Sequence, residues 1–374
     1  MNRSATIEMK NREIFSIILN YKYTEMSNRS QKAFLKAHLA EHLILENAYY
    51  YFYNHAKNEI ELMKYISGLT NIDYSSFLLT ASNNFTDLID MFFYAITNFN
   101  DNKFISEESF FEQKEAVYRE YGYKRFSYKG CCNIFLNFIY ELLDIDIENE
   151  LNMLSLKDII NFIDVNFVLD NLSVTYVGKC INKMNGFRYM EESNKSKFTK
   201  KLYPIKRKKN FKEFYNTNLG ETWFGKIFSC VHTISQYFEF EILSKTIYFS
   251  VKYLLKSEDT YLPVDFIGTH YTKYGSYFVC KVNEIIDPEK VFEIRKLDLD
   301  SIIENVLTEY KNRLIIKLDG LIEFARFSNK MLLLTNSFMQ DIEQYIFILD
   351  SISIENIKEL IYSINKFEYV HFFS

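Results

Sequence analysis

Strand-like and helix-like stretches alternate along this chain, and the same order of elements occurs twice. In the first half, residues 12–23 are rich in Ile, Phe and Tyr and predict a strand, and residues 31–46 have the apolar spacing of a helix. A second strand is predicted at 74–82 and a second helix at 84–98. Such alternation favours an antiparallel-rich sheet with helices packed on it over an all-helical bundle.

The second half repeats this order. It begins with a strand-like stretch at 221–234, continues with an apolar helix at 239–255, and returns to strand-like sequence at 269–282. Charged helices are predicted near 288–312 and 338–349. The chain therefore predicts an α+β fold made of two similar α/β sandwich domains.

A basic segment at 191–212 separates the two halves. Nine of its residues are Lys or Arg, and it holds one of the chain's three prolines. We interpret it as a linker between a first domain at 1–190 and a second domain at 213–374, and a docking site for an acidic peptide is the alternative. Two domains also agree with the length of 374 residues, since a domain has roughly 100–200 residues.

Composition excludes several classes of partner. The net charge of −5 provides no basic field for nucleic acid or for an anionic membrane surface. The N-terminal apolar stretch at Phe15–Leu19 is shorter than the core of a signal peptide, and no run approaches the roughly 18 apolar residues of a spanning helix. Five scattered cysteines without a C-x-x-C pair indicate a reducing compartment, so we expect a cytoplasmic protein. Cys131 and Cys132 are expected to fill a core, with redox or metal chemistry as the alternative.

The strongest chemical signal is the stretch AHLAEHLILE at 37–46. His38 and His42 lie four positions apart on the predicted helix, so both imidazoles project from one face about one turn apart. Glu41 lies one step off that face, where its carboxylate can reach a water on a metal without binding the metal. The competing interpretation is an amphipathic helix that carries two of the chain's six histidines by chance. A catalytic zinc site would need one more protein ligand.

A candidate for that ligand lies on the next acidic helix. Ser106 is the expected N-cap of a helix that begins at the following residue, and Glu120 shares one face of this helix with Gln113. Taken alone, its acidic residues are typical of a solvated helix face. With the two histidines upstream, Glu120 becomes the candidate third ligand, separated from His42 by 77 residues.

This pattern resembles the inverted zinc motif of the pitrilysin and insulinase metallopeptidases, in which His-x-x-Glu-His precedes a glutamate seventy-odd residues on. Segments 37–45 and 111–120 follow the two family helices in register. The resemblance implies the compact two-domain type, similar to subunits of mitochondrial processing peptidase and to peptide-maturation proteases. It makes Glu41 the general base for the attack of water on a peptide bond. The ligands that it implies for Zn²⁺ are His38, His42 and Glu120.

Three positions depart from the family pattern. Gln113 stands where the family has a glutamate that supports a ligand without touching the metal, and Lys36 stands where a glycine is usual. In the second half, the family carries an arginine and a tyrosine that hold the substrate backbone and the developing oxyanion. Here Tyr261 is the candidate tyrosine, with an ordinary loop tyrosine as the alternative. Lys256 or Lys252 stands where the arginine is expected.

Two functions follow from the resemblance. The first is a zinc-dependent endopeptidase that cleaves short unstructured peptides, with leader removal from a ribosomally made, bacteriocin-type peptide as the expected role by analogy. The second is a catalytically weak or inactive scaffold, acting as the partner subunit of a peptidase of the same fold. Family members of this size usually work as dimers that enclose the substrate. A lysine in place of the arginine favours a heterodimer whose partner supplies the missing residue.

Overall fold

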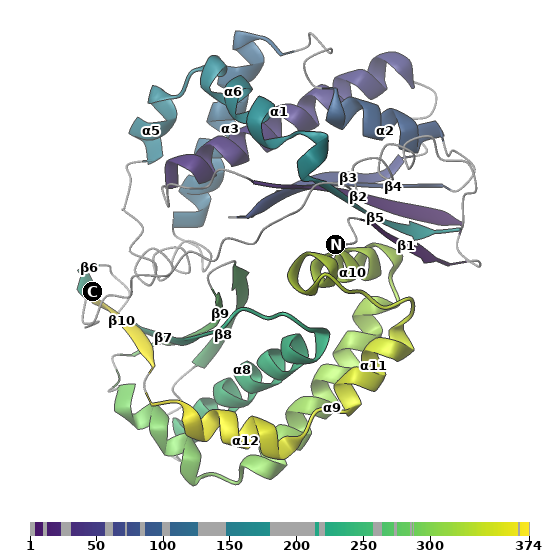
Figure 1. Cartoon of the computed structure of the whole chain (residues 1–374). Coiled ribbons are helices and arrows are strands. Elements are labelled where there is room, and N and C mark those ends of the chain that lie inside the picture. The colour runs from purple at the N-terminus through teal and green to yellow at the C-terminus, as the bar shows by residue number, and fades with distance from the viewer. Residues whose placement is uncertain are drawn as a thin grey trace. The chain divides into compact units, whose positions relative to one another are not determined.

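The structure is a computed structural model of the 374-residue chain (Figure 1). Within the residues that it describes, no helix combines the length and the apolar content needed to cross a membrane. The described residues are 4–9, 13–23, 31–56, 63–71, 73–82, 87–98, 105–125, 147–179, 214–216, 221–256, 264–272, 275–284, 286, 288–365 and 367–373.

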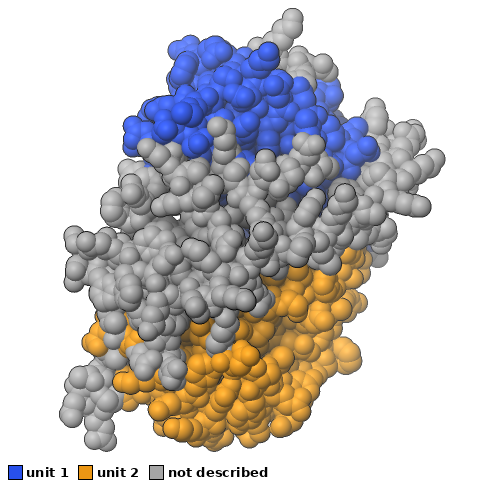
Figure 2. All heavy atoms as spheres, turned by 60° about the vertical axis from the view of Figure 1, so that its left-hand side comes forward, with its two compact units in different colours: residues 1–127, 142–200, 319–332 blue, residues 128–141, 201–318, 333–374 orange. Residues whose placement is uncertain are grey.

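The chain divides into two compact units, which Figure 2 shows in different colours. The first unit contains residues 1–127, 142–200 and 319–332, and the second contains residues 128–141, 201–318 and 333–374. The sequence did not predict that 319–332 belong with the first half of the chain. The predicted boundaries at 1–190, 191–212 and 213–374 stay a prediction, because the basic segment lies outside the described residues.

The first unit is built on a five-stranded sheet with the order β1-β5-β2-β4-β3. β1 pairs with β5 in parallel, and every other neighbouring pair is antiparallel. Strands β2 and β4 agree closely with the predicted strands at 12–23 and 74–82. The strands are β1 (Ser4–Glu8), β2 (Ile14–Lys22), β3 (Met63–Thr70), β4 (Tyr74–Ser82) and β5 (Leu172–Gly178).

The second unit has a five-stranded sheet of the same design, with the order β6-β10-β7-β9-β8. Its first pair, β6 with β10, is parallel, and the other three pairs are antiparallel. Each strand therefore has a counterpart in the first sheet, which confirms the predicted α+β fold of two similar, antiparallel-rich domains. The strands are β6 (Phe214–Asn216), β7 (Glu221–Phe228), β8 (Val264–Thr272), β9 (Gly275–Val282) and β10 (Glu368–Phe373).

Long helices cover one face of the first sheet. α1 packs against α2, α3, α6 and β3, and its apolar residues at four-residue intervals lie in one buried core with alternate residues of β2. These core residues are Leu35, Leu39 and Leu43 of α1 and Phe15, Ile17 and Leu19 of β2. The helical elements of this layer are α1 (Gln31–His55), α2 (Asp87–Thr97), α3 (Glu107–Arg125), α5 (Ile147–Met153), α6 (Leu156–Asn166) and the short η2 (Leu169–Asn171).

The opposite face of this sheet is buried and polar. Because side chains alternate across a strand, Asn20 of β2 and Thr175 of β5 point away from the α1 core. Helix α10 (Leu321–Thr335) lies on this side of the sheet (Figure 1). The side chain of Asn329 on α10 exchanges two hydrogen bonds with Asn20 and accepts one from Thr175. A helix from late in the chain thereby satisfies polar groups of the first sheet.

The helices of the second unit include α8, which follows β7 as α1 follows β2. α8 begins at Ile234, five residues before the predicted start at 239, because the side chain of Thr233 caps it by accepting from the Gln236 amide. The predicted strand at 221–234 ends at Phe228, so its last part was wrong. The helical elements are α8 (Ile234–Leu254), η3 (Pro288–Lys296), α9 (Leu299–Leu318), α11 (Ile342–Asp350) and α12 (Ile354–Ser363).

Replacing Asn329 by leucine is expected to lower the free energy of opening of the first sheet by about 3 kcal/mol, because Asn20 and Thr175 lose buried partners. Hydrogen exchange of the β2 amides measures this change. The matched control is Asn312→Leu on the exposed side of α9, which is expected to change stability by less than about 0.5 kcal/mol. Equal protection of β2 in both variants would contradict a stabilising role for Asn329.

Candidate metal centre

The candidate site lies where α3 packs against α1. Helix α3 begins as predicted, with the Ser109 amide donating to the hydroxyl of Ser106 at 3.0 Å. Its middle is held by the ammonium of Lys114, which donates to the carbonyl of Leu154 at 3.1 Å. Burial lowers the pKa of this lysine. The Phe110 side chain anchors α3 in the core of the first unit, so both helices that carry the site are tied to the same core.

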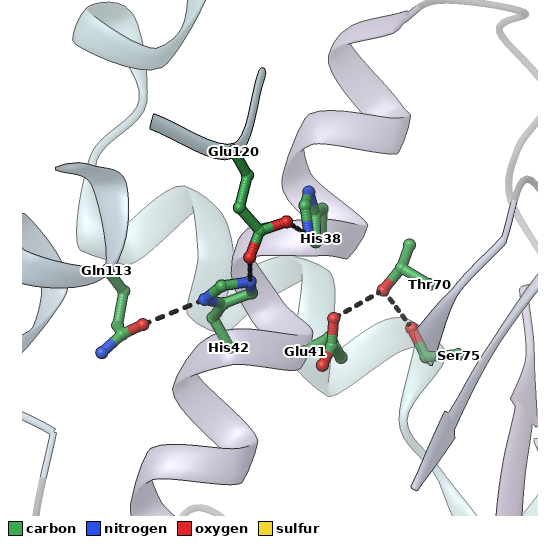
Figure 3. A network of polar contacts seen from close by, with 7 residues as sticks. All are labelled: His38, Glu41, His42, Thr70, Ser75, Gln113 and Glu120. Carbon is green, nitrogen blue, oxygen red and sulfur yellow. Dashed lines mark hydrogen bonds and ion pairs between the residues drawn. The ribbon is translucent and has the colours of Figure 1, made fainter. Parts of the chain in front are cut away.

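The structure brings the three predicted ligands together (Figure 3). One oxygen of Glu120 lies 3.4 Å from Nε2 of His38, and its other oxygen lies 3.3 Å from Nε2 of His42. The two imidazole rings stand edge to face with centroids 4.8 Å apart. A single carboxylate on α3 thus faces two imidazoles that α1 presents one turn apart.

These distances fit a zinc ion. Zinc bonds of about 2.0–2.1 Å at tetrahedral angles place neighbouring ligand atoms about 3.3 Å apart, which agrees with the two nitrogen-to-oxygen separations. The atom types also fit, since zinc in proteins is held by imidazole nitrogen and carboxylate oxygen. The ligand atoms of His38, Glu41 and His42 also lie within 4.8 Å of one another, so the Glu41 carboxylate borders the same site.

The site is buried on one side and open on the other. His38 is 7% exposed and Glu41 is 5% exposed, whereas the side chain of Glu120 is 43% exposed. A metal held here would be enclosed by α1 and reachable from the side of Glu120. A catalytic metal site needs such access for its substrate, and three protein ligands would leave a fourth position on zinc for water.

Gln113 orients His42. The side-chain oxygen of Gln113 lies 3.0 Å from Nδ1 of His42. Because an amide oxygen can only accept, Nδ1 of His42 is the donor in this contact, and Nε2 is the ring nitrogen that faces Glu120. Gln113 therefore lies on the side of His42 opposite Glu120, and its predicted role in supporting a ligand stays a prediction.

The carboxylate of Glu41 is held by strand β3, which the sequence analysis did not predict as a strand. The Thr70 hydroxyl donates to Oε2 of Glu41 at 3.3 Å and is itself 3.1 Å from the hydroxyl of Ser75 on β4 (Figure 3). A Cβ atom on Gly68 would lie only 1.8 Å from Oε1 of Glu41. The sequence provided no advance signal for these neighbours, because no strand was predicted at 63–70.

The matching helix of the second unit carries a carboxylate but no imidazole. Glu241 on α8 is 6% exposed, and it accepts hydrogen bonds from Thr269 and Tyr271 of β8, each at 2.6 Å. Phe238 and Ile242 occupy the positions relative to Glu241 that His38 and His42 occupy relative to Glu41. Burial and the nearby Glu241 carboxylate raise the pKa of Tyr271 well above its usual range. The repeat therefore retains the buried acid and lacks the metal ligands.

The other predicted site residues lie in the second unit. Tyr261 and the residues around it are outside the described residues, so its predicted role stays a prediction. Lys252 lies with its ammonium 5.9 Å from the ring centre of Tyr248, and Lys256 is exposed. The cysteine pair at 131–132 also falls outside the described residues.

No protein-family model and no curated protein matches the sequence. Solved structures do match it. An M16-like peptidase from Alicyclobacillus acidocaldarius has a TM-score of 0.67 at 11% identity, over 99% of this chain and 95% of that chain. A protease from Helicobacter pylori has a TM-score of 0.69 at 14% identity, over 99% and 97% of the two chains.

The periplasmic protease PqqL from Escherichia coli has a TM-score of 0.68 at 10% identity. The match covers 99% of this chain and 46% of that chain, so one copy of this chain spans about half of PqqL. Identities this low establish the architecture and not the activity. On these likenesses and its own two matching sheets, the chain has the two-domain α+β fold of the M16-like peptidases.

Proposed function

We propose that this chain is a zinc-dependent endopeptidase in which His38, His42 and Glu120 hold the metal and Glu41 is the general base. The observation that carries the proposal is the position of the Glu120 carboxylate, whose two oxygens lie 3.4 and 3.3 Å from the two Nε2 atoms. The likeness to peptidases of the same fold supports the reaction class. The buried carboxylate of Glu41 next to this group supports proton transfer.

The reaction is hydrolysis of a peptide bond. A zinc ion in this site would supply a Lewis acid that polarises the scissile carbonyl and acidifies a water molecule. Glu41 accepts a proton from the attacking water as the water oxygen forms a bond to the carbonyl carbon. Glu41 then donates that proton to the amide nitrogen as the carbon–nitrogen bond breaks, which yields a carboxylic acid and an amine and restores the Glu41 carboxylate.

The burial of the site favours an unstructured peptide as substrate. His38 and Glu41 lie below the surface, and access is from the side of Glu120. A flexible segment can bring its carbonyl to such a depth, whereas the surface of a folded protein cannot without local unfolding. Removal of a leader segment from a ribosomally made, bacteriocin-type peptide fits this requirement, and we propose it as the role.

A dimer is the proposed working state. The match covers 46% of PqqL, so a chain of this size corresponds to only about half of that protease, which supports a second subunit beside this one. The absence of an arginine near Tyr261 in the sequence makes an unlike partner the preferred one, because that partner can supply a second cation.

The test uses the full chain loaded with one equivalent of zinc and a fluorogenic unstructured peptide. It is run with the chain alone and with any peptidase-like protein that a neighbouring gene encodes. Zinc-dependent cleavage in either mixture is the expected result. If the chain binds no stoichiometric zinc and cleaves in neither mixture, the proposal is wrong and the function is that of an inactive partner subunit.

Changing Gln113 is expected to alter zinc affinity in both directions. In Gln113→Glu, the new carboxylate accepts from Nδ1 of His42 and raises the basicity of Nε2, so zinc is expected to bind about tenfold more tightly. In Gln113→Leu the hydrogen bond is lost, and zinc is expected to bind about tenfold more weakly. Competition with a chromophoric chelator measures both. Equal affinities in the two variants would show that Gln113 does not tune the site.

A further inference from the structure

We propose that Thr70 is a positioning residue for Glu41, through which strand β3 sets where the general base lies. This inference rests on the proposed function and extends it to residues outside the metal-binding pattern. Thr70 acts on the reaction through Glu41, to whose Oε2 atom its hydroxyl donates at 3.3 Å. The structure places no ligand candidate on β3.

A chain of hydroxyl groups leads from the core to this carboxylate. The hydroxyl of Tyr23 lies 2.5 Å from that of Ser75, and Ser75 lies 3.1 Å from the hydroxyl of Thr70. Each hydroxyl has one proton, and Thr70 donates its proton to Glu41. Thr70 therefore accepts from Ser75, and Ser75 accepts from Tyr23. All three hydroxyl groups therefore donate in the direction of Glu41.

Tyr23, the first donor in this row of hydroxyl groups, is fixed in the interior. Burial raises the pKa of Tyr23, so its hydroxyl stays protonated and available as a donor. Its ring packs on Phe162 and Phe167 with centroids 5.8 and 6.3 Å apart. Because the packed ring of Tyr23 cannot move with the Glu41 carboxylate, the row of hydroxyl groups favours one position of that carboxylate.

Strand β3 also leaves room for the carboxylate. Gly68 lies two residues before Thr70, and a Cβ atom there would stand 1.8 Å from Oε1 and 2.6 Å from Cδ of Glu41. One oxygen of the carboxylate thus lies over the glycine while the other accepts from Thr70. Because a glutamate side chain has several rotatable bonds, α1 alone does not determine where its carboxylate lies. The strand supplies both the space and the donor.

The second unit also holds a helix carboxylate with hydroxyl groups of a strand. Thr269 and Tyr271 of β8 donate to Glu241 of α8, at 2.6 Å each. Gly268 follows Glu241 by 27 residues, as Gly68 follows Glu41, but a Cβ atom on Gly268 would meet Nε2 of His270 at 3.7 Å and no atom of Glu241 within 4 Å. Strand hydroxyls that donate to a helix carboxylate thus occur in both units, and the close glycine is a feature of the first unit.

The experiment compares Thr70→Val with Thr70→Ser in the full-length, zinc-loaded chain. Valine keeps the shape of threonine and removes the donor, whereas serine keeps the donor. We expect Thr70→Val to lower kcat about 10- to 100-fold with KM and zinc content unchanged, since a misplaced catalytic group loses rate and not binding. We expect Thr70→Ser to retain kcat within about twofold. Wild-type kcat in Thr70→Val would overturn the inference.

A structural readout separates positioning from a general loss of stability. In a crystal structure of metal-free Thr70→Val, the Glu41 carboxylate is expected to leave its place over Gly68, while in Thr70→Ser it stays. An unmoved carboxylate in Thr70→Val would also overturn the inference. A decrease in kcat that Thr70→Ser shares in full would do the same, because it would reflect strand damage and not loss of the donor.

A double-mutant cycle keeps this inference distinct from the proposed function. In a Glu41→Gln background, Thr70→Val is expected to cause no further loss of kcat, because the group that it positions is already gone. If Glu41→Gln is as active as wild type, the proposed function fails first. If Glu41→Gln is inactive and Thr70→Val is fully active, the proposed function stands and only the role of Thr70 is refuted.

Discussion

Replacing Glu41 by glutamine is expected to lower kcat for peptide cleavage by about 10³-fold, with zinc content unchanged. Glutamine has nearly the same shape but cannot accept a proton from water, and general base catalysis contributes about 10²- to 10⁴-fold to such a reaction. The hydrogen bond from Thr70 can still form to the amide oxygen, so the fold should be retained. Initial rates on a fluorogenic unstructured peptide, with zinc measured by mass spectrometry, test this expectation.

The internal repeat provides a matched control. Glu241→Gln makes the same change in a buried acid on the equivalent helix of the second unit. The amide oxygen of the glutamine can still accept the hydrogen bonds from the hydroxyls of Thr269 and Tyr271. We expect this variant to keep kcat within about twofold, since no metal ligands surround Glu241. If the two variants lose activity equally, the loss comes from disturbing a buried carboxylate and its neighbours, and the assignment of Glu41 as the base is wrong.

Replacing His42 by alanine is expected to weaken zinc binding by roughly 10²- to 10³-fold and to abolish cleavage. Zinc sites with four ligands bind with about 10–16 kcal/mol, so each ligand accounts for about 3 kcal/mol. The Glu120 carboxylate would keep only one imidazole partner, His38. Zinc affinity by chelator competition and activity at saturating zinc are the two measurements.

The control for this variant lies on the same helix. His55→Ala removes an exposed imidazole at the end of α1, where it stacks on Tyr51 at a centroid distance of 4.3 Å. It is expected to leave zinc affinity and kcat within about twofold of wild type. Chelator treatment of the wild type should abolish cleavage, and added zinc should restore it. Activity that survives complete removal of zinc would exclude a metallopeptidase.

Elements with strong local signals were predicted well. β4 has the predicted bounds 74–82, and α3 begins after its predicted Ser106 cap. α1 was predicted from its apolar spacing, although it continues to His55. The error at the start of α8 arose because a β-branched, apolar run before Thr233 has the composition of a strand. Local propensity determines whether most of these segments are helix or strand, and a capping side chain determines where α8 starts.

Elements that depend on distant partners were not predicted. β1 is a strand through its parallel pairing with β5, more than 160 residues away, and β3 is the edge strand of the first sheet. α10 belongs with the first unit because Asn329 meets Asn20 across 309 positions of sequence. A buried polar face on a sheet gives no hydrophobic periodicity, so the partner that buries it cannot be inferred from a sequence window.

By itself the sequence determined the two matching halves and the pairing of the two histidines, because helical periodicity puts His38 and His42 on one face whatever surrounds them. It also indicated Glu120 and Gln113, through the register of a second helix. Only the tertiary structure decided that Glu120 meets both imidazoles and that Thr70 and Gly68 hold Glu41. The physical reason is that a carboxylate on a flexible side chain takes its position from neighbours on other elements, and those contacts exist only after the helix and the strand have packed together.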